Sequence, residues 1–255
     1  MKKSPRTLTE AEVRLAYEKV ERALNQLLAN FPHDLPSQGP WWLAPDSTEA
    51  EVLRYAARFG RYHMAELATG LEHDINKYSS SDLLIDFNGA AGMNGIMLVL
   101  LGLADRLVVV DHCPAAGAVA LELAALVNVK CSYQDVTSFQ THATTDATIH
   151  SIFLLASHAQ NVLYFDAEAD AALELQNQRL LQILQKTFPV VDTLSAISLE
   201  PARGKRGLQH LLRPWHVNFC AESFSHVPVA KFGRGLRVGH KKYEAAILAK
   251  ALVNS

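Results

Sequence analysis

Residues 81–114 read SDLLIDFNGAAGMNGIMLVLLGLADRLVVVDHCP. An apolar run ends at Asp86, a loop of small residues follows, and an apolar segment of helical length spans residues 96–103. A second apolar run, residues 107–110, ends at Asp111. Short continuous apolar runs are typical of parallel strands that are buried on both faces. The stretch therefore predicts a strand–helix–strand unit in which each strand ends on an acid.

The carboxyl ends of these two strands predict a nucleoside half-site. Ligands of open α/β sheets bind outside the carboxyl ends of the strands, where a small-residue loop lets backbone N–H groups approach them closely. An acid in the position of Asp111 can accept hydrogen bonds from both hydroxyls of a ribose. A tight turn with close helix–sheet packing is the alternative explanation of the loop, and the loop alone does not decide between the two.

The block resembles motif I of the class I S-adenosylmethionine (SAM)-dependent methyltransferases, which is an acid-x-Gly-x-Gly-x-Gly run after the first strand. Asp86, Asn88, Ala90 and Gly92 occupy its four positions, so small residues replace two of the three glycines. For the same reason the dinucleotide fingerprint G-x-G-x-x-G is not cleanly present. The form D-F-N-G-A-A-G is closer to motif I of several nucleic-acid methyltransferases than to the usual small-molecule form.

The resemblance implies SAM as the cofactor, with the motif I acid near its methionine end and Asp111 on its ribose hydroxyls. Asp135 follows a third strand, expected over residues 127–133, at the interval where the family contacts the adenine amino group. A solvent-exposed loop aspartate is the alternative for Asp135. The expected cofactor-binding residues are Asp86, Asn88, Gly89, Ala90, Gly92, Asp111, His112, Asp135, Val136 and Ser157.

Acceptor chemistry in this family is decided after the fourth strand, which is expected over residues 147–155. The sequence that follows is Ala-Ser-His-Ala-Gln-Asn, which contains neither the Asn/Asp-Pro-Pro-Tyr/Phe of N-methylation nor the Pro-Cys of the cytosine-C5 enzymes. His158 is the expected catalytic residue, acting as a general base near neutral pH, and a structural hydrogen-bonding role is its alternative. No metal is required, and the three cysteines lie far apart with no C-x-x-C.

Residues 1–80 are expected to form a helical N-terminal extension. Its second helix is expected to start at residue 46 or 47 and to run to about residue 69, following the apolar periodicity. In the family that the sequence resembles, such helices often cover SAM or contribute to the acceptor pocket, which makes Tyr55, Tyr62 and His63 candidates for that wall. Packing of the extension onto the sheet is the alternative role, because large aromatic side chains carry most of the burial in such interfaces.

The expected fold class is α/β, a doubly wound, mostly parallel seven-stranded sheet (the Rossmann-like methyltransferase fold) with the helical extension in front. Residues 81–255 would form the SAM-binding methyltransferase domain. A fifth strand is expected over residues 193–199. The last strand, expected over residues 243–249, would insert antiparallel. Pro114 suits the first turn of the helix that follows the second strand.

Composition limits the class of protein. The chain has 255 residues, 49% of them hydrophobic, which suffices for a full core. A formal net charge of −2 argues against wholesale binding to nucleic acid or to membranes. The N-terminal residues lack a signal-peptide pattern and no apolar run is long enough to span a bilayer, so a soluble cytoplasmic protein without a membrane partner is expected. The oligomeric state is not indicated.

The acceptor is argued from residues 202–242, which carry nine Lys and Arg residues against a single acid, with aromatic residues interleaved. Such a segment is a plausible surface for phosphates and unstacked bases, and a solvated face is the alternative. We expect a SAM-dependent methyltransferase that acts on RNA or another nucleic acid. A small-molecule methyltransferase is the first alternative. A catalytically inactive SAM-fold subunit for binding or assembly is the second.

Overall fold

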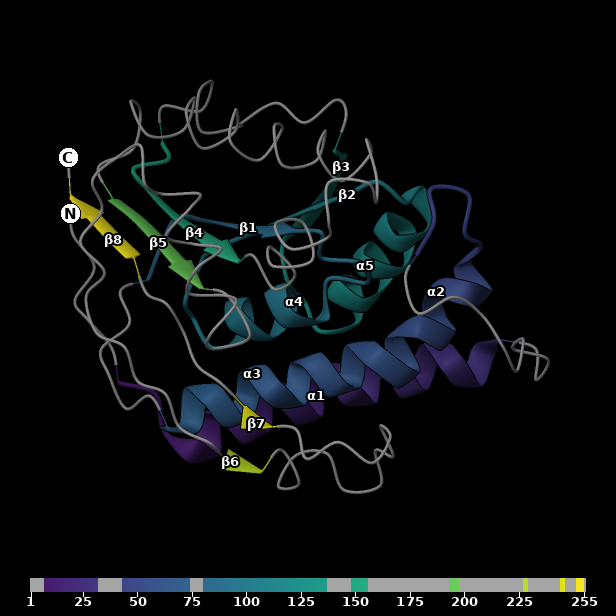
Figure 1. Ribbon diagram of the computed structural model, residues 1–255, viewed down its shortest axis with the longest axis horizontal. Coiled ribbons are helices and arrows are strands. Elements are labelled where there is room, and N and C mark those ends of the chain that lie inside the picture. The colour runs from purple at the N-terminus through teal and green to yellow at the C-terminus, as the bar shows by residue number, and fades with distance from the viewer. Residues whose placement is uncertain are drawn as a thin grey trace.

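The computed structural model describes residues 7–31, 43–73, 80–136, 148–155, 193–197, 227–228, 244–245 and 251–254. A six-stranded sheet lies over a layer of helices, and the N-terminal helices form a further layer below that one (Figure 1). Buried apolar residues on one face of the sheet, among them Leu84, Val109 and Leu155, form one continuous cluster with those of both helical layers.

The main sheet has the strand order β3-β2-β1-β4-β5-β8. Its strands are β1 (Leu83–Phe87), β2 (Leu107–Asp111), β3 (Cys131–Asp135), β4 (Ser151–Leu155), β5 (Thr193–Ile197) and β8 (Ala251–Asn254). The first five strands in this order pair in parallel, and β8 pairs antiparallel with β5. The chain runs outward from β1 through β2 to β3, and then returns to β4 on the other side of β1. The strand order therefore reverses between β1 and β4, which is the place where ligands of open α/β sheets bind.

The sheet confirms the expected α/β class, with a mostly parallel sheet, helices packed on it and a last strand that is antiparallel. The sheet contains six strands in the part of the chain that the structure describes, so the expected count of seven is not confirmed. The described helices lie on one face of the sheet (Figure 1), and the second helical layer of a doubly wound fold is therefore not tested.

Three expected strands are placed wrongly by the sequence pattern. β4 begins at Ser151 and not at residue 147. β3 begins at Cys131 and not at residue 127, because the preceding helix continues to Leu126 and Asn128 closes it with a left-handed φ of 58°. In the region of the expected last strand, Glu244–Ala245 forms β7, which pairs with β6 (Val227–Pro228) in a separate two-stranded sheet. The antiparallel strand is β8, because apolar residues continue past residue 249 and periodicity alone does not locate the strand.

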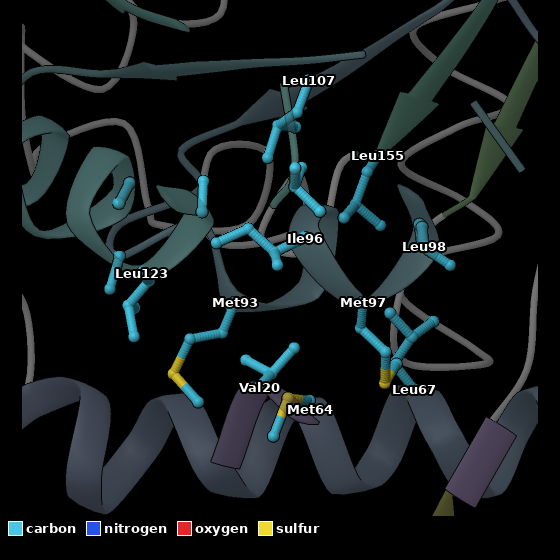
Figure 2. Packing of buried hydrophobic residues seen from close by; sticks show 14 of the residues in the cluster. Val20, Met64, Leu67, Met93, Ile96, Met97, Leu98, Leu107, Leu123 and Leu155 are labelled. Carbon is cyan, nitrogen blue, oxygen red and sulfur yellow. The ribbon is translucent and has the colours of Figure 1, made fainter. Parts of the chain in front are cut away.

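The helix α4 (Met93–Leu100) is buried between the sheet and the N-terminal helices, α1 (Glu10–Asn30) and α3 (Arg61–His73). Figure 2 shows Met93 and Met97 of α4 pointing toward Val20 of α1 and toward Met64 and Leu67 of α3. The extension therefore packs mainly on α4, and also on α5 (Pro114–Leu126). As expected, α5 begins at a proline.

The expected second helix of the extension is divided into three parts. α2 (Glu49–Tyr55) starts two to three residues later than expected, at a capping box between Thr48 and Glu51. A π-helical segment, η1 (Ala56–Gly60), follows, and α3 continues from it. Such π-helical segments are rare, and they often occur at functional sites. A Cβ on Gly60 would lie 2.8 Å from the sulfur of Met93, so η1 approaches the start of α4 closely.

A search for membrane-crossing helices among the described residues finds none of sufficient length and apolarity.

Candidate functional site

Three acids stand at the carboxyl ends of three adjacent strands. Asp86 is the fourth residue of β1, and Asp111 and Asp135 are the last residues of β2 and β3. Asp111 and Asp135 are partners in the strand register. Because β1 borders the switch point of the sheet, this edge is where a ligand is expected.

Asp86 is a buried carboxyl group that is incompletely satisfied. Its side chain is 1% exposed, and Oδ2 accepts a hydrogen bond of 3.2 Å from the backbone N–H of Gly95. Oδ1 has no hydrogen-bond partner among the described residues. Burial, opposed by the Gly95 bond and assisted by the charge of Asp111, raises the pKa of Asp86 to about 7. A Cβ on Gly89 would lie 2.7 Å from the Asp86 carboxyl carbon, so the loop closes tightly over this group.

The loop between β1 and α4 has left-handed backbone at every second residue. The φ angles of Asn88, Ala90 and Gly92 are 55°, 48° and 66°. These are the three positions at which motif I carries glycine, so the chain keeps a glycine-type conformation at two residues that are not glycine. Gly92 also packs closely, because a Cβ there would lie 2.9 Å from Cγ2 of Val109. A larger side chain at Gly92 would therefore clash with Val109, whether or not a ligand is bound.

Asp111 connects this loop with the start of α5. Its Oδ2 accepts from the backbone N–H of Ala90 at 2.9 Å, and its Oδ1 accepts from the N–H of Cys113 at 3.0 Å. Burial raises the pKa of Asp111, and His112 and these backbone bonds oppose the shift. The Nδ1 atom of His112 lies 3.4 Å from Oδ1 of Asp111, and its Nε2 lies 2.8 Å from the carbonyl oxygen of Leu43 in the extension.

Asp135 and Val136 lie beside Asp111. The N–H of Val136 donates to the backbone oxygen of Asp111 at 3.0 Å, and the hydroxyl of Tyr133 donates to the same oxygen at 2.9 Å. The Asp135 side chain is half-buried.

A small pocket lies between the extension and the loop that follows β1. Its lining consists of Tyr55, Ala56, Gly60, His63, Gly89, Ala90, Ala91, Met93 and Asn94. Burial, and to a smaller extent the charge of Asp111, raise the pKa of Tyr55 to about 12. Along the chain, the π-helical η1 separates the two pocket residues Tyr55, at the end of α2, and His63, in the first turn of α3.

Glu66 holds two neighbouring side chains of α3. Its Oε1 accepts a hydrogen bond of 2.8 Å from the Tyr62 hydroxyl, and its Oε2 lies 3.1 Å from Nδ1 of His63. The His63 and Glu66 side chains are 24% and 13% exposed. Of the three aromatic residues that the sequence offers as a pocket wall, Tyr55 and His63 line the pocket, and Tyr62 is buried beside Glu66.

The structure brings most of the predicted site residues together. Residues Asp86, Asn88, Gly89, Ala90, Gly92, Asp111, His112, Asp135 and Val136 all lie at the carboxyl edge of β1, β2 and β3. Ser157 and the expected catalytic residue His158 lie outside the described residues. Sequence reasoning missed Glu66, Met93 and Asn94. The three-residue spacing of His63 and Glu66 on a helix was a signal that would have found Glu66.

Among the described residues, no group of three or more His, Cys, Asp and Glu side chains is arranged to hold a metal ion.

No protein-family model and no curated protein match the sequence. The structure is similar to the 16S rRNA methylase RmtB, with 11% sequence identity, a TM-score of 0.47, and coverage of 93% of this chain and 75% of that chain. It is also similar to M. capricolum TrmK in complex with S-adenosyl-homocysteine (SAH), with 12% identity, a TM-score of 0.39, and coverage of 68% and 62%. The ribosomal protein L11 methylase from Lactobacillus delbrueckii subsp. bulgaricus has 12% identity, a TM-score of 0.39, and coverage of 75% and 77%. At TM-scores this low, function has to be argued from the site itself.

Proposed function

We propose that the protein is a SAM-dependent methyltransferase. The observation that carries the proposal is the arrangement of Asp86, Asp111 and Asp135 at adjacent strand ends around a left-handed loop, beside the switch point of the sheet. We extend the proposal to the complete seven-stranded sheet, and to a division between a helical extension at residues 1–80 and a SAM-binding domain at residues 81–255.

The residues present fit SAM. The unpartnered Oδ1 of Asp86 is a buried acceptor at the position that the resemblance assigns to the cationic methionine end. Asp111 would hold the ribose hydroxyls, because each carboxylate oxygen can accept a further hydrogen bond beside the one from Ala90 or Cys113. Asp135 would contact the adenine amino group. SAM carries no phosphate, so the loop does not need the full glycine cradle that a pyrophosphate requires.

The chemistry divides between cofactor and protein. SAM supplies an activated methyl group on a sulfonium, so the protein has to bind it, orient it and place the acceptor atom in line with it. The strand-end acids and the loop backbone do the binding. The pocket in front of the loop, lined by Tyr55 and His63, is the proposed entry of the acceptor.

Cofactor binding is tested by calorimetric titration with SAM and with SAH. Asp111→Asn should weaken both affinities by ~1–3 kcal/mol, because the ribose hydroxyls lose their charged acceptor. Asp105→Asn, at an exposed turn before β2, is the matched control and should leave both affinities unchanged. A folded parent protein that binds neither ligand would refute the proposal. It would also refute the alternative of an inactive subunit that still binds SAM.

The acceptor that we propose is RNA or another nucleic acid, on the basis of the basic segment 202–242. Joint neutralisation of Arg234, Arg237, Lys241 and Lys242 should weaken nucleic-acid binding across sequences. It should also flatten the log–log salt dependence of binding by ~0.7–0.9 for each phosphate that the variant no longer neutralises. Fluorescence anisotropy between low and moderate salt measures this, and SAM binding serves as the control. A parent protein without salt-sensitive binding would exclude nucleic acid as the acceptor.

A small-molecule acceptor is the second candidate, and one observation favours it. The described lining of the pocket contains aromatic, small and amide side chains and the thioether of Met93, and it contains no Lys or Arg. Transfer of a radiolabelled methyl group from SAM to total RNA, to DNA and to a small-molecule extract separates the two candidates directly.

A further inference from the structure

The pair formed by His63 and Glu66 has the geometry of an oriented base at the mouth of the cofactor loop. His63 lines the pocket together with Gly89, Ala90 and Asn94, which belong to the loop and to the start of α4. Its Nδ1 is held at 3.1 Å by Oε2 of Glu66, and Glu66 is fixed in turn by the Tyr62 hydroxyl at 2.8 Å. A carboxylate on Nδ1 selects the tautomer that carries its proton there, so the ring exchanges protons with a substrate through Nε2.

We propose that His63 is the general base of methyl transfer, and that Glu66 is its positioning residue. This inference rests on the proposed function. When an N–H or O–H acceptor attacks the methyl carbon of SAM, the new bond to that carbon forms as the carbon–sulfur bond breaks. The sulfur keeps the electron pair, and SAH leaves as a neutral thioether. The acceptor proton passes to Nε2 of His63, and Glu66 stabilises the imidazolium that results. The acceptor class is therefore a protic nitrogen or oxygen nucleophile.

A test that needs no acceptor follows from the charge of the cofactor. SAM carries a positive sulfonium, whereas SAH lacks the methyl group and is neutral at sulfur. If His63 faces the methyl group, its protonated form repels SAM and does not repel SAH. Protonation is lost as pH rises, so the ratio of SAM affinity to SAH affinity should rise with pH, by roughly ten-fold between pH 5.5 and 8.5. A titratable group that interacts equally with SAM and SAH changes both affinities by the same factor, so its effect cancels in this ratio.

The other titratable groups near the pocket and the loop include Glu66 and Tyr62 on α3 and Tyr55 on α2. Behind the loop lie Asp86, Asp111, His112 and Asp135. The pKa of Asp86 lies near 7, so ionisation of this carboxyl also favours a cationic ligand as pH rises. For this reason the decisive quantity is the difference between the parent and His63→Gln. The variant His150→Gln is the matched control, because His150 is exposed at the opposite end of the sheet, where β4 begins.

The experiment is calorimetric titration of the intact protein with SAM and with SAH across this pH range. Supporting outcomes are a pH-dependent SAM/SAH ratio in the parent and in His150→Gln, and a flatter ratio in His63→Gln and in His63→Asn. Glu66→Gln should also flatten the pH dependence of the ratio, because the ring is no longer held in place by the carboxylate, and a merely structural role of Glu66 would not change the ratio. The inference would be overturned if the ratio in both His63 variants depended on pH as strongly as it does in the parent. SAM binding by itself would still support the proposed function. Absence of SAM and SAH binding in the parent would refute the proposed function, and the inference with it.

Discussion

At the scale of single residues, the loop after β1 shows that a left-handed conformation has been retained without the glycines that usually provide it. Ala90 has a φ of 48° and donates its N–H to Asp111. Left-handed backbone costs an L-residue ~1–2 kcal/mol because its Cβ crowds the neighbouring carbonyl. The hydrogen bond to a buried carboxylate offsets part of that cost. The conformation of the loop is therefore stabilised by its contact with Asp111 and is not favoured by the local sequence.

Ala90→Gly should raise the free energy of unfolding by about 0.5–1 kcal/mol. The strain at Ala90 is relieved, and the larger conformational freedom of glycine in the unfolded chain cancels part of the gain. Urea denaturation measures the change. Ala91→Gly is the control, because Ala91 is buried without a left-handed φ and should lose stability. Loss of stability in both variants would show that Ala90 is not strained.

Asp86 should make stability fall as pH rises between about 4 and 7. Burial raises its pKa to about 7 in the folded protein, against ~3.9 in the unfolded chain. Below pH ~4 the carboxyl is protonated in both states. Between these values the folded state retains a proton that the unfolded state releases, so the free energy of unfolding declines, by up to ~4 kcal/mol.

Asp86→Asn should remove most of this decline, because an amide does not titrate. Urea denaturation of both proteins at several values between pH 4 and pH 8 gives the comparison. Asp111 shifts in the same direction and stays in both proteins, so the difference between the two curves is the informative quantity. The exposed Asp105→Asn provides a control that should follow the parent. Parallel curves for the parent and Asp86→Asn would contradict the raised pKa.

At the scale of elements, α5 and β3 pack through a glycine. A Cβ on Gly117 would lie 2.3 Å from the nearest carbon of the Tyr133 ring, and the Tyr133 hydroxyl donates to the backbone oxygen of Asp111. The closeness of helix and strand thus positions a ring that supports the end of β2. The contact joins packing directly to the site.

Gly117→Ala should lower the free energy of unfolding by ~1–3 kcal/mol, because the added methyl forces the ring to move. The sign of this change identifies the clash, since Gly→Ala inside a helix ordinarily raises the free energy of unfolding by ~1 kcal/mol. A double-mutant cycle with Tyr133→Ala isolates the clash: Gly117→Ala should regain its ordinary stabilising effect when the ring is absent. Equal costs in the two backgrounds would mean that the ring does not limit the approach.

Elements were predictable from sequence where a single pattern decided them. The apolar runs that end at Asp86 and Asp111 located β1 and β2 to within one residue, since buried parallel strands have no competing periodicity. The boundaries of β3 and β8 were wrong because apolar helix ends and apolar strands look alike. The π-helical η1 has no periodicity signal of its own, and it depends on the close approach of Gly60 to Met93. Glu66, by contrast, could have been found from its three-residue spacing to His63 on a helix.

At the scale of the whole molecule, the extension and the sheet share one core. Leu24 of α1 is fully buried in the same cluster as Ile96 of α4 and Leu155 of β4. The pocket depends on this union, because one wall comes from the extension and the other from the loop after β1. A cofactor bound in the loop would therefore stabilise the extension as well.

Leu24→Ala should cost ~2–5 kcal/mol and should keep a single unfolding transition, because the cavity weakens a core that both parts use. Hydrogen exchange measures the effect on α1 and on β1 separately, and the two losses should be equal. Leu15→Ala on the same helix is the control, since that side chain is 50% exposed. Loss of protection confined to α1 would show that the extension unfolds independently.

The pairing of β5 with β8, which is distant in sequence, affects folding during synthesis. The outer edge of β5 is paired by residues 251–254, which are translated long after residues 193–197. Until then the growing chain carries a sheet edge whose N–H and C=O groups can pair with a neighbouring polypeptide. Closing so long a loop is slow, because its entropy must be lost before the strand pair forms. The nascent chain is therefore most open to aggregation after residues 193–197 have been made and before residues 251–254 can pair with them, when most of the sheet already exists.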